Sequence, residues 1–446
     1  MSGFQVIYVP IGVPTFHLES AQAEFERSIE LLKRVEPNCI VPEQMLLSLD
    51  LLETFLEGKV PDLIVLQNNT FANAAYASAV LSRFDCPILL WTLREPVIDG
   101  GRLRLNSLTG AYSAANAISA FRGSRFGYVF GSPTEEKVIR SVEACVGAAK
   151  VMREMKELKM ASIGHTPQGF GFGRALDLDL LKSFGVTLES IEARELIDRA
   201  KAYTDEEAQE YLQDASKRIC GLDHIDPKNV LDFARLYRAY KEYVTEHGIG
   251  ALSSRCWPDF FTAFGTPVCS VLGILGDLGI AAACEADAYG ALSMFMGMKL
   301  SGQPVFFGDP VSMDEKENTI TFWHCGMAAC SLAREDAGAA TGLHCNRKIG
   351  PTLDFGCKPC ENVTVFRIGR KPDGTFRFFV MEGEALDMPK QFTGTSVVVR
   401  AKGNAEQTVY GSVKDGWEPH FVVIYGGVAE ELSMVAEFMG IEVCKY

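Results

Sequence analysis

Two acidic residues bound the segment of the sequence with the clearest chemical pattern. Glu285 follows a run of small apolar residues, and Asp309 follows the apolar run VFFG, with a stretch rich in glycine, alanine and methionine between them. This pattern predicts a strand, a crossover helix and a second strand, with a carboxylate at the end of each strand. Because the carboxyl ends of neighbouring parallel strands meet at one edge of a sheet, we expect the two carboxylates to lie close together. Such a pair either shares a proton or binds a hard divalent cation.

Each of these acids alone also fits a plainer role, as a helix cap or as one partner of a surface ion pair. We expect Asp287 to begin the crossover helix rather than to act as a third ligand. Histidine is scarce, with seven in 446 residues, so its positions are informative. His420 precedes the run FVVIY, and His324 and His344 lie in the segments TFWHC and TGLHC. Taken singly, each of the three is more often a hydrogen-bonded structural residue than a ligand.

The elements that must position these residues fall into three regions. Residues 1–157 alternate short β-branched apolar runs with helical periodicity, which is typical of βαβ units around a parallel sheet. The same alternation resumes over residues 158–312, which carry Glu285 and Asp309. Residues 313–446, which carry His420, contain mainly strands and turns. The predicted class is therefore α/β, with two Rossmann-like parallel-sheet domains followed by a mostly antiparallel β domain.

Several other segments have patterns of their own. The GFGFG segment at 169–173 resembles a phosphate-binding loop but lacks the lysine of a P-loop, so we interpret it as a plain turn. The charged stretch 205–243 predicts a pair of amphipathic helices. Cys357 and Cys360 form a CxxC without a second pair, which favours a structural role over zinc binding. The segment EQTVYG at 406–411 predicts a strand, and the last twenty residues predict a helix and a final strand.

The composition excludes several classes of protein. With 47% hydrophobic and 22% charged residues, the chain can fill a core. Its net charge of −14 argues against nucleic-acid and anionic-membrane partners. The thirteen cysteines follow no disulfide framework, which favours a cytoplasmic location. We expect neither a secretory leader nor a membrane span.

One family combines these features. A glutamate ends a strand, a glycine-rich helix follows and closes in a Ser-Gly turn, and an aspartate comes 24 residues after the glutamate. The segment RCWP lies upstream at 255–258, and His420 lies five residues before a Tyr-Gly pair. In these motifs and in its three-domain order, nearly the whole chain resembles the L-fucose isomerase and L-arabinose isomerase superfamily, most closely its fucose isomerase-like branch.

The resemblance implies a site for a divalent metal. Glu285, Asp309 and His420 would bind it, usually as Mn²⁺ with Mg²⁺ or Co²⁺ as substitutes, and the two carboxylates would be the catalytic acid–base pair. Such a donor set also suits Mn²⁺ or Mg²⁺ better than zinc on chemical grounds. Arg255 and Trp257 would line the sugar pocket, and His324 is an approximate counterpart of a fourth histidine ligand in arabinose isomerases. The resemblance also implies a homo-hexamer or trimer in which Gln67, Asn68 and Trp91 act on a neighbouring subunit's site.

The implied reaction is an aldose–ketose isomerisation that moves a proton between C1 and C2 of a sugar through a cis-enediol. A divalent cation chelated by O1 and O2 would stabilise the enediolate. Candidate substrates are L-fucose, arabinose and, preferred over both, the 6-sulfonated hexose sulfoquinovose, on which relatives of these isomerases act. In an acidic protein a sulfonate needs a cationic anchor, for which Arg94, Arg255 and Arg347 are the candidates. The alternative is a non-catalytic sugar-binding or regulatory protein on the same fold.

Overall fold

The computed structural model describes residues 3–446 and divides into two units. The first unit contains the residues up to Glu154 together with Glu430–Glu442. The second contains Met155–Ala429 and the four closing residues, Val443–Tyr446. Both units are therefore built from more than one stretch of the chain.

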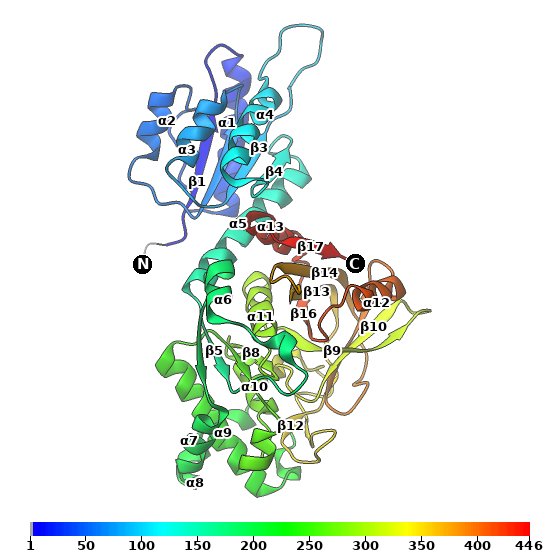
Figure 1. Ribbon diagram of the computed structural model, residues 1–446. Helices are drawn as coiled ribbons and strands as arrows, with labels where there is room; N and C mark the ends of the chain where they lie inside the picture. The colour runs from blue at the N-terminus through cyan, green and yellow to red at the C-terminus, as the bar shows by residue number, and fades with distance from the viewer. Residues whose placement is uncertain (1–2) are drawn as a thin grey trace. The chain divides into compact units, whose positions relative to one another are not determined.

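A parallel sheet forms the centre of the first unit (Figure 1, blue to cyan). Its strands lie in chain order: β1 (Val6–Ile11), β2 (Leu63–Asn68), β3 (Ile88–Thr92) and β4 (Gly127–Phe130). The helices of this unit are α1 (Leu18–Val35), α2 (Leu49–Leu56), α3 (Ala74–Leu81), α4 (Ser107–Arg122), α5 (Glu136–Glu157) and α13 (Ala429–Met439). Alternate β1 side chains share one core with α2, α3 and α4, whereas Tyr8 stacks on Phe25 of α1. Because helices cover both faces, the first three strands are buried along their whole length.

A second parallel sheet opens the second unit, in the order β6-β5-β7-β8 (Figure 1, green). Its strands are β5 (Lys159–Ile163), β6 (Thr187–Ile191), β7 (Ala251–Ser254) and β8 (Ala281–Cys284). The accompanying helices are α6 (Asp177–Phe184), α7 (Ala193–Ala202), α8 (Asp205–Ser216), α9 (Pro227–His247), α10 (Cys269–Asp277) and α11 (Ala288–Ser301). α11 is buried almost all round, which explains its composition of small and apolar residues.

A mostly antiparallel sheet completes the second unit. Its order is β13-β16-β9-β10-β15-β14-β17, and β13 also pairs with β14, so six of the strands close into a barrel. The strands are β9 (Phe306–Asp314), β10 (Thr319–His324), β13 (Cys360–Arg370), β14 (Phe376–Ala385), β15 (Thr395–Ala401), β16 (Phe421–Tyr425) and β17 (Glu442–Lys445). The short strands β11 (Thr341–Gly342) and β12 (Thr352–Leu353) pair separately, and α12 spans Ala405–Lys414.

The predicted class is confirmed at this level: two parallel sheets and one mostly antiparallel sheet in a mixed α/β chain. The domain boundaries at 157/158 and 312/313 stay predictions. The helix pair in the charged stretch and the closing helix and strand are present as α8, α9, α13 and β17.

Two elements differ from expectation. The segment EQTVYG is not a strand but part of α12, because the Asn404 side chain accepts the Gln407 N–H and starts a helix there. The strand before Asp309 does not end at that residue. β9 continues to Asp314 and pairs with β10 and β16, so it belongs to the antiparallel sheet and not beside β8.

Two further observations concern the whole described chain. No helix in residues 3–446 is both long and apolar enough to cross a membrane. All thirteen cysteines, which lie in that range, are free thiols.

Candidate active site

Glu285 lies in a strained turn between β8 and α11. β8 ends at Cys284 and α11 begins at Ala288, and between them Glu285 and Ala286 have φ angles of 58° and 56°. Left-handed backbone costs a residue other than glycine about 1–3 kcal/mol, so surrounding contacts must hold it. One of these is the Ala286 N–H, which donates to the Ser254 carbonyl at 3.1 Å. The turn directs the Glu285 carboxylate towards side chains from two other elements.

Two donors hold that carboxylate. Trp257 Nε1 donates to Oε1 at 2.8 Å, and His420 Nε2 lies 2.9 Å from Oε2. Burial raises the pKa of Glu285, but the hydrogen bond with His420 and the charge of His324 outweigh burial and hold that pKa below its ordinary value. Glu285 is therefore an ionised, fixed acceptor.

His420 is held from its other side by Asp287. Its Nδ1 lies 2.9 Å from Asp287 Oδ2, and Asp287 also caps α11 by accepting the Gly290 N–H at 2.8 Å. Arg367 of β13, which is fully buried, donates to Asp287 Oδ2 at 2.8 Å and to the His420 carbonyl at 3.0 Å. Burial raises the pKa of Asp287, but the Arg367 charge outweighs it and holds that pKa far below its ordinary value. Asp287 is thus the helix residue expected from the sequence, and it also orients His420.

This arrangement requires a positive charge at His420 Nε2. If Nδ1 carries a proton for Asp287, a neutral ring would turn the Nε2 lone pair towards a carboxylate oxygen. A proton or a metal ion at Nε2 removes that repulsion. Burial lowers the pKa of His420, but the hydrogen bonds with Asp287 and Glu285 outweigh burial and raise it to about 9. The donor set therefore fits a cation.

Asp309 reaches the same place from β9. Its Oδ1 lies 3.6 Å from His420 Nε2, and its side chain is 30% exposed. Burial raises the pKa of Asp309, with the charge of His420 opposing the effect. The two predicted carboxylates thus lie near one imidazole. The prediction that they end neighbouring strands of one parallel sheet was wrong. Asp309 comes from the antiparallel sheet, not from the end of a strand next to β8.

His324 completes the group from the end of β10. Its Nδ1 accepts the Cys325 N–H at 2.9 Å, whereas its Nε2 is buried without a hydrogen-bond partner. Ligand atoms of Glu285, His324 and His420 lie within 4.8 Å of one another. A buried unpaired ring nitrogen costs free energy unless a ligand satisfies it. Two carboxylates and two imidazoles therefore converge here. The carboxylate oxygens are ligands that Mn²⁺ and Mg²⁺ prefer, and these ions also accept imidazole nitrogen.

Aromatic rings from the glycine-rich turn cover this group. The Phe172 ring centroid is 5.5 Å from that of His420, and Phe170 contacts both Trp257, at 5.8 Å, and His420, at 6.2 Å. Gly173 lies so close to α11 that an added Cβ would be 2.8 Å from Asp287 Cα. The turn interpretation of residues 169–173 agrees with the short 3₁₀ turn found there. The glycine allows a close approach of the turn, and the phenylalanine rings lie against Trp257 and His420.

Comparison with known proteins adds an independent observation. No family model matches the chain. Over 442 residues, 99% of both chains, it is 62% identical to a sulfoquinovose isomerase of Clostridium sp. (strain MSTE9). It is 38% identical over 450 residues, 100% of both chains, to a sulfoquinovose isomerase of Priestia megaterium (strain ATCC 12872 / QMB1551). It is 36% identical over 441 residues, 98% of both chains, to a sulfoquinovose isomerase of Alkalicoccus urumqiensis.

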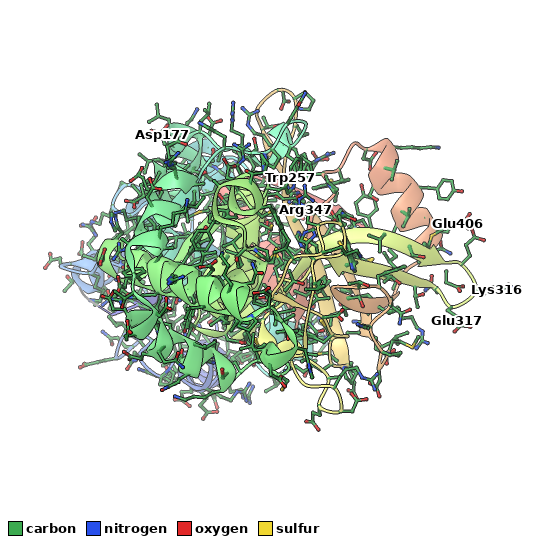
Figure 2. All side chains as sticks on the ribbon, turned by 90° about the horizontal axis from the view of Figure 1, so that it is seen from below. Asp177, Trp257, Lys316, Glu317, Arg347 and Glu406 are labelled. Carbon is green, nitrogen blue, oxygen red and sulfur yellow. The ribbon has the colours of Figure 1, made fainter. Side chains whose placement is uncertain are left out.

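The chain belongs to the sulfoquinovose isomerase family. Two of the three arginines predicted as sulfonate anchors lie in its second unit. Arg255 Nε is 2.6 Å from Asp259 Oδ2 and 3.2 Å from the Trp257 carbonyl, so its charge is already paired. Arg347 lies over the rings of Trp257 and Phe261, at 5.5 and 4.9 Å from their centroids. Figure 2 labels Arg347 and Trp257 close to each other. Among the described residues no carboxylate forms an ion pair with Arg347.

The residues of the first unit that were predicted to bind substrate have other partners. Gln67 is fully buried and hydrogen-bonded to Tyr8 and Ser28. Trp91 is also fully buried and donates to the Gly131 carbonyl at 2.9 Å. Arg94 forms two hydrogen bonds with Glu135, at 2.6 and 3.0 Å. By contrast, Asn68 at the end of β2 is fully buried, and its side-chain amide has no hydrogen-bond partner among the described residues. Their contact with a sugar in this sulfoquinovose isomerase family member stays a prediction.

Sequence reasoning missed three contributors to the site. Arg367 lies 80 positions from Asp287 within an ordinary strand pattern, and no local signal marks it. Phe170 and Phe172 were visible as unusual residues for a glycine-rich turn, since large rings beside glycines are unnecessary for a plain loop. The combination of large rings and glycines was a signal that this turn packs its rings on a neighbouring element, here at His420.

Proposed function

We propose that this chain is an aldose–ketose isomerase that converts sulfoquinovose to the corresponding 2-ketose and uses a divalent metal ion. One observation carries the proposal. The carboxylates of Glu285 and Asp309 converge with His324 and His420 in a chain that is 62% identical to a sulfoquinovose isomerase. The reaction needs a group that stabilises an enediolate and a group that moves a proton, and this set of side chains supplies both.

Glu285, Asp309 and His420 would hold the ion, with His324 as a further nitrogen donor. Mn²⁺ is the proposed species because the donors combine oxygen with imidazole nitrogen and no sulfur. When bound, such an ion supplies Lewis-acid stabilisation to the oxygens on C1 and C2. Metal dependence is also what the resemblance to L-fucose isomerases implies, and placement in that superfamily is part of the proposal.

The two carboxylates would have different tasks. Glu285 is fixed by Trp257 and His420 on its two oxygens, which favours a role in binding. Asp309 accepts no hydrogen bond from any described residue, and it is the more exposed of the two. Its burial raises the pKa, which suits a group that must both accept and return a proton. Asp309 is therefore proposed to move the proton between C1 and C2, while Phe170 and Phe172 exclude water.

Arg347 is proposed as the anchor for the sulfonate. Arg94 and Arg255 each have a carboxylate partner, whereas Arg347 stacks on Trp257, the residue that donates to Glu285. A guanidinium at this position would bind a sulfonate through charge-assisted hydrogen bonds. It would thereby orient the opposite end of the sugar towards the carboxylates.

Solvent exchange tests the proposal against the sugar-binding alternative. The Mn²⁺-loaded protein is incubated in D₂O with sulfoquinovose, 6-deoxyglucose, L-fucose or arabinose, and ketose formation and deuterium at C2 are measured. We expect both with sulfoquinovose, and loss of both in Glu285→Gln. The matched control is Glu315→Gln. Glu315 lies in the exposed turn between β9 and β10, so this variant should behave as wild type. Binding of sulfoquinovose without ketose or exchange would favour a non-catalytic binding protein.

A further inference from the structure

A second group of potential metal ligands lies directly behind the candidate active site. It consists of Cys256, Cys269, Cys284, Cys325 and His344, which we call the thiol cluster. Ligand atoms of Cys269, Cys325 and His344 lie within 4.8 Å of one another. The neighbouring thiols of Cys284 and Cys325 lower the pKa of the Cys269 thiol. None of these residues belongs to the CxxC at 357–360.

The cluster is built by the same backbone that builds the active site. Cys256 precedes Trp257, Cys284 precedes Glu285, and Cys325 follows His324. Each of these three cysteines is therefore the direct chain neighbour of a residue of the candidate active site, so the same turns and strand ends position both groups. Cys269 adds a thiol from the first residue of α10, and His344 adds an imidazole from the loop after β11.

Burial distinguishes this cluster from scattered surface thiols. Cys256, Cys269 and Cys284 are at most 1% exposed, and His344 is 3% exposed. Cys325 is half-buried. One buried thiol is an ordinary small apolar residue, but four thiols and an imidazole gathered together are not needed for packing. Their convergence points to a site for a metal ion that prefers sulfur ligands.

We propose that Cys269, Cys325, His344 and Cys284 form a binding site for Zn²⁺, separate from the carboxylate site. Tetrahedral zinc with thiolate and imidazole ligands has neighbouring donor atoms about 3.8 Å apart, given Zn–S bonds of about 2.3 Å. The donor atoms of Cys269, Cys325 and His344 lie within 4.8 Å of one another and need only small shifts to reach that spacing, and Cys284, at the end of β8, would supply the fourth ligand. Binding exchanges the three thiol protons for the ion and releases them to solvent. Thiolates select zinc over Mn²⁺ and Mg²⁺, whereas the carboxylate site has the opposite preference.

Zinc here would also fix the loop that carries Arg347. His344 is three residues before Arg347, and its ring packs edge-on against Phe261, on which Arg347 also lies. Coordination of His344 would thus hold this loop against α10 and β8. The metal site itself does not depend on the proposed reaction.

Cobalt spectroscopy on the full chain tests the proposal. The reduced protein is freed of metal with a chelator and titrated with Co²⁺, which binds at both oxygen and sulfur sites. Thiolate ligands give intense sulfur-to-cobalt charge-transfer bands and tetrahedral ligand-field bands, whereas an octahedral oxygen and nitrogen site gives only weak absorption. We expect one cobalt per chain with the thiolate spectrum, displaced by one equivalent of Zn²⁺ and not by Mn²⁺. A fully titrated wild-type protein without thiolate bands would overturn the proposal.

Variants locate the site. Cys269→Ser removes one of three thiolates, so it should weaken the thiolate bands by about a third or more and lower the affinity for cobalt, and Cys325→Ser, at a less buried position, provides a second test if Cys269→Ser does not fold. Cys145→Ser is the matched control, because Cys145 is fully buried on α5 of the first unit. Thiolate bands of unchanged intensity and unchanged cobalt affinity in both Cys269→Ser and Cys325→Ser would assign the bands to other cysteines and contradict the proposal.

Discussion

Asp287 has three partners, and each ties the candidate site to a different element of the second unit. It caps α11, it orients His420 before β16, and it neutralises Arg367 of β13. Arg367 is fully buried, so its charge depends on Asp287 and on Glu418, whose Oε2 lies 3.6 Å from Arg367 Nε. A residue of this kind acts on the reaction through His420 and is a positioning residue.

Replacing Asp287 by Asn leaves Arg367 short of a buried counter-charge. We expect the free energy of unfolding to fall by about 3–5 kcal/mol, as urea denaturation would measure. Because His420 would lose the acceptor that orients it, Mn²⁺ affinity should also fall by about 10–100-fold, as titration of the folded variant would measure. Asp336→Asn, in an exposed pair with Arg334, is the control and should change neither quantity appreciably. Unchanged Mn²⁺ affinity in a folded Asp287→Asn protein would refute the positioning role.

Arg347 provides a test of substrate recognition at the same scale. In Arg347→Met, KM for sulfoquinovose should rise about tenfold or more, since a charge-assisted hydrogen bond contributes about 1.5–3 kcal/mol. The kcat/KM for 6-deoxyglucose, which has no sulfonate, should stay near its wild-type value. Arg194→Met, on the exposed face of α7, is the matched control. Equal losses with both sugars would mean that Arg347 supports the fold of the pocket and does not anchor the sulfonate.

At the scale of elements, a charged network joins α7 to α9. The Glu242 carboxylate of α9 accepts hydrogen bonds from Arg199 of α7 at 2.7 Å, Arg238 at 2.8 Å and Tyr203 at 2.7 Å. Burial raises the pKa of Glu242, but these three donors outweigh it and lower the pKa to about 2. The charged stretch that predicts a solvated helix pair thus also carries a partly buried network.

This network makes stability depend on pH. The pKa of Glu242 is lower in the folded protein than in the unfolded chain, where it is about 4.3. Its stabilisation is therefore complete above about pH 5 and is lost as the pH falls towards 2. Glu242→Gln should reduce the free energy of unfolding by about 2 kcal/mol at pH 7, and the difference from wild type should shrink at pH 3. The control Glu206→Gln, at an exposed position of α8, should show no such trend. A difference that stays constant with pH would contradict this account.

The elements also show what the sequence could predict. The alternation of apolar runs and helical periods was enough for both parallel sheets, because burial on two faces produces long apolar strands. The error at α12 arose in a six-residue window, where Thr408 and Val409 favour a strand by type but Asn404 supplies a cap. The error at β9 arose because Pro310 suggests a strand end. Pro310 is instead tolerated next to a register shift between Thr321 and Phe322 of β10.

The candidate site was predictable only in part for a related reason. Glu285, Asp309 and His420 carry signals of residue type and position next to apolar runs. Asp287, Arg367 and the thiol cluster instead depend on contacts between residues distant in sequence, and such pairings leave no periodic trace. Their roles follow only from the folded structure.

On the scale of the whole molecule, the net charge of −14 bears on the substrate. An acidic protein repels an anionic sugar on average, so a sulfonate needs a local cation that no carboxylate neutralises. Of the three candidate arginines, Arg347 meets that condition, since Arg94 and Arg255 are both paired with carboxylates. The hexamer or trimer implied by the resemblance to L-fucose isomerases stays a prediction.

The path of the last seventeen residues has a consequence for biosynthesis. Residues Glu430–Glu442 belong to the first unit, where Met434 lies against Gly127 of β4, and Val443–Tyr446 return to the second unit beside β14. A ribosome makes Glu430–Glu442 only after Met155–Ala429 of the second unit. The first unit therefore lacks α13 while most of the second unit is being synthesised. During that time the surface of the first unit that α13 later covers stays open.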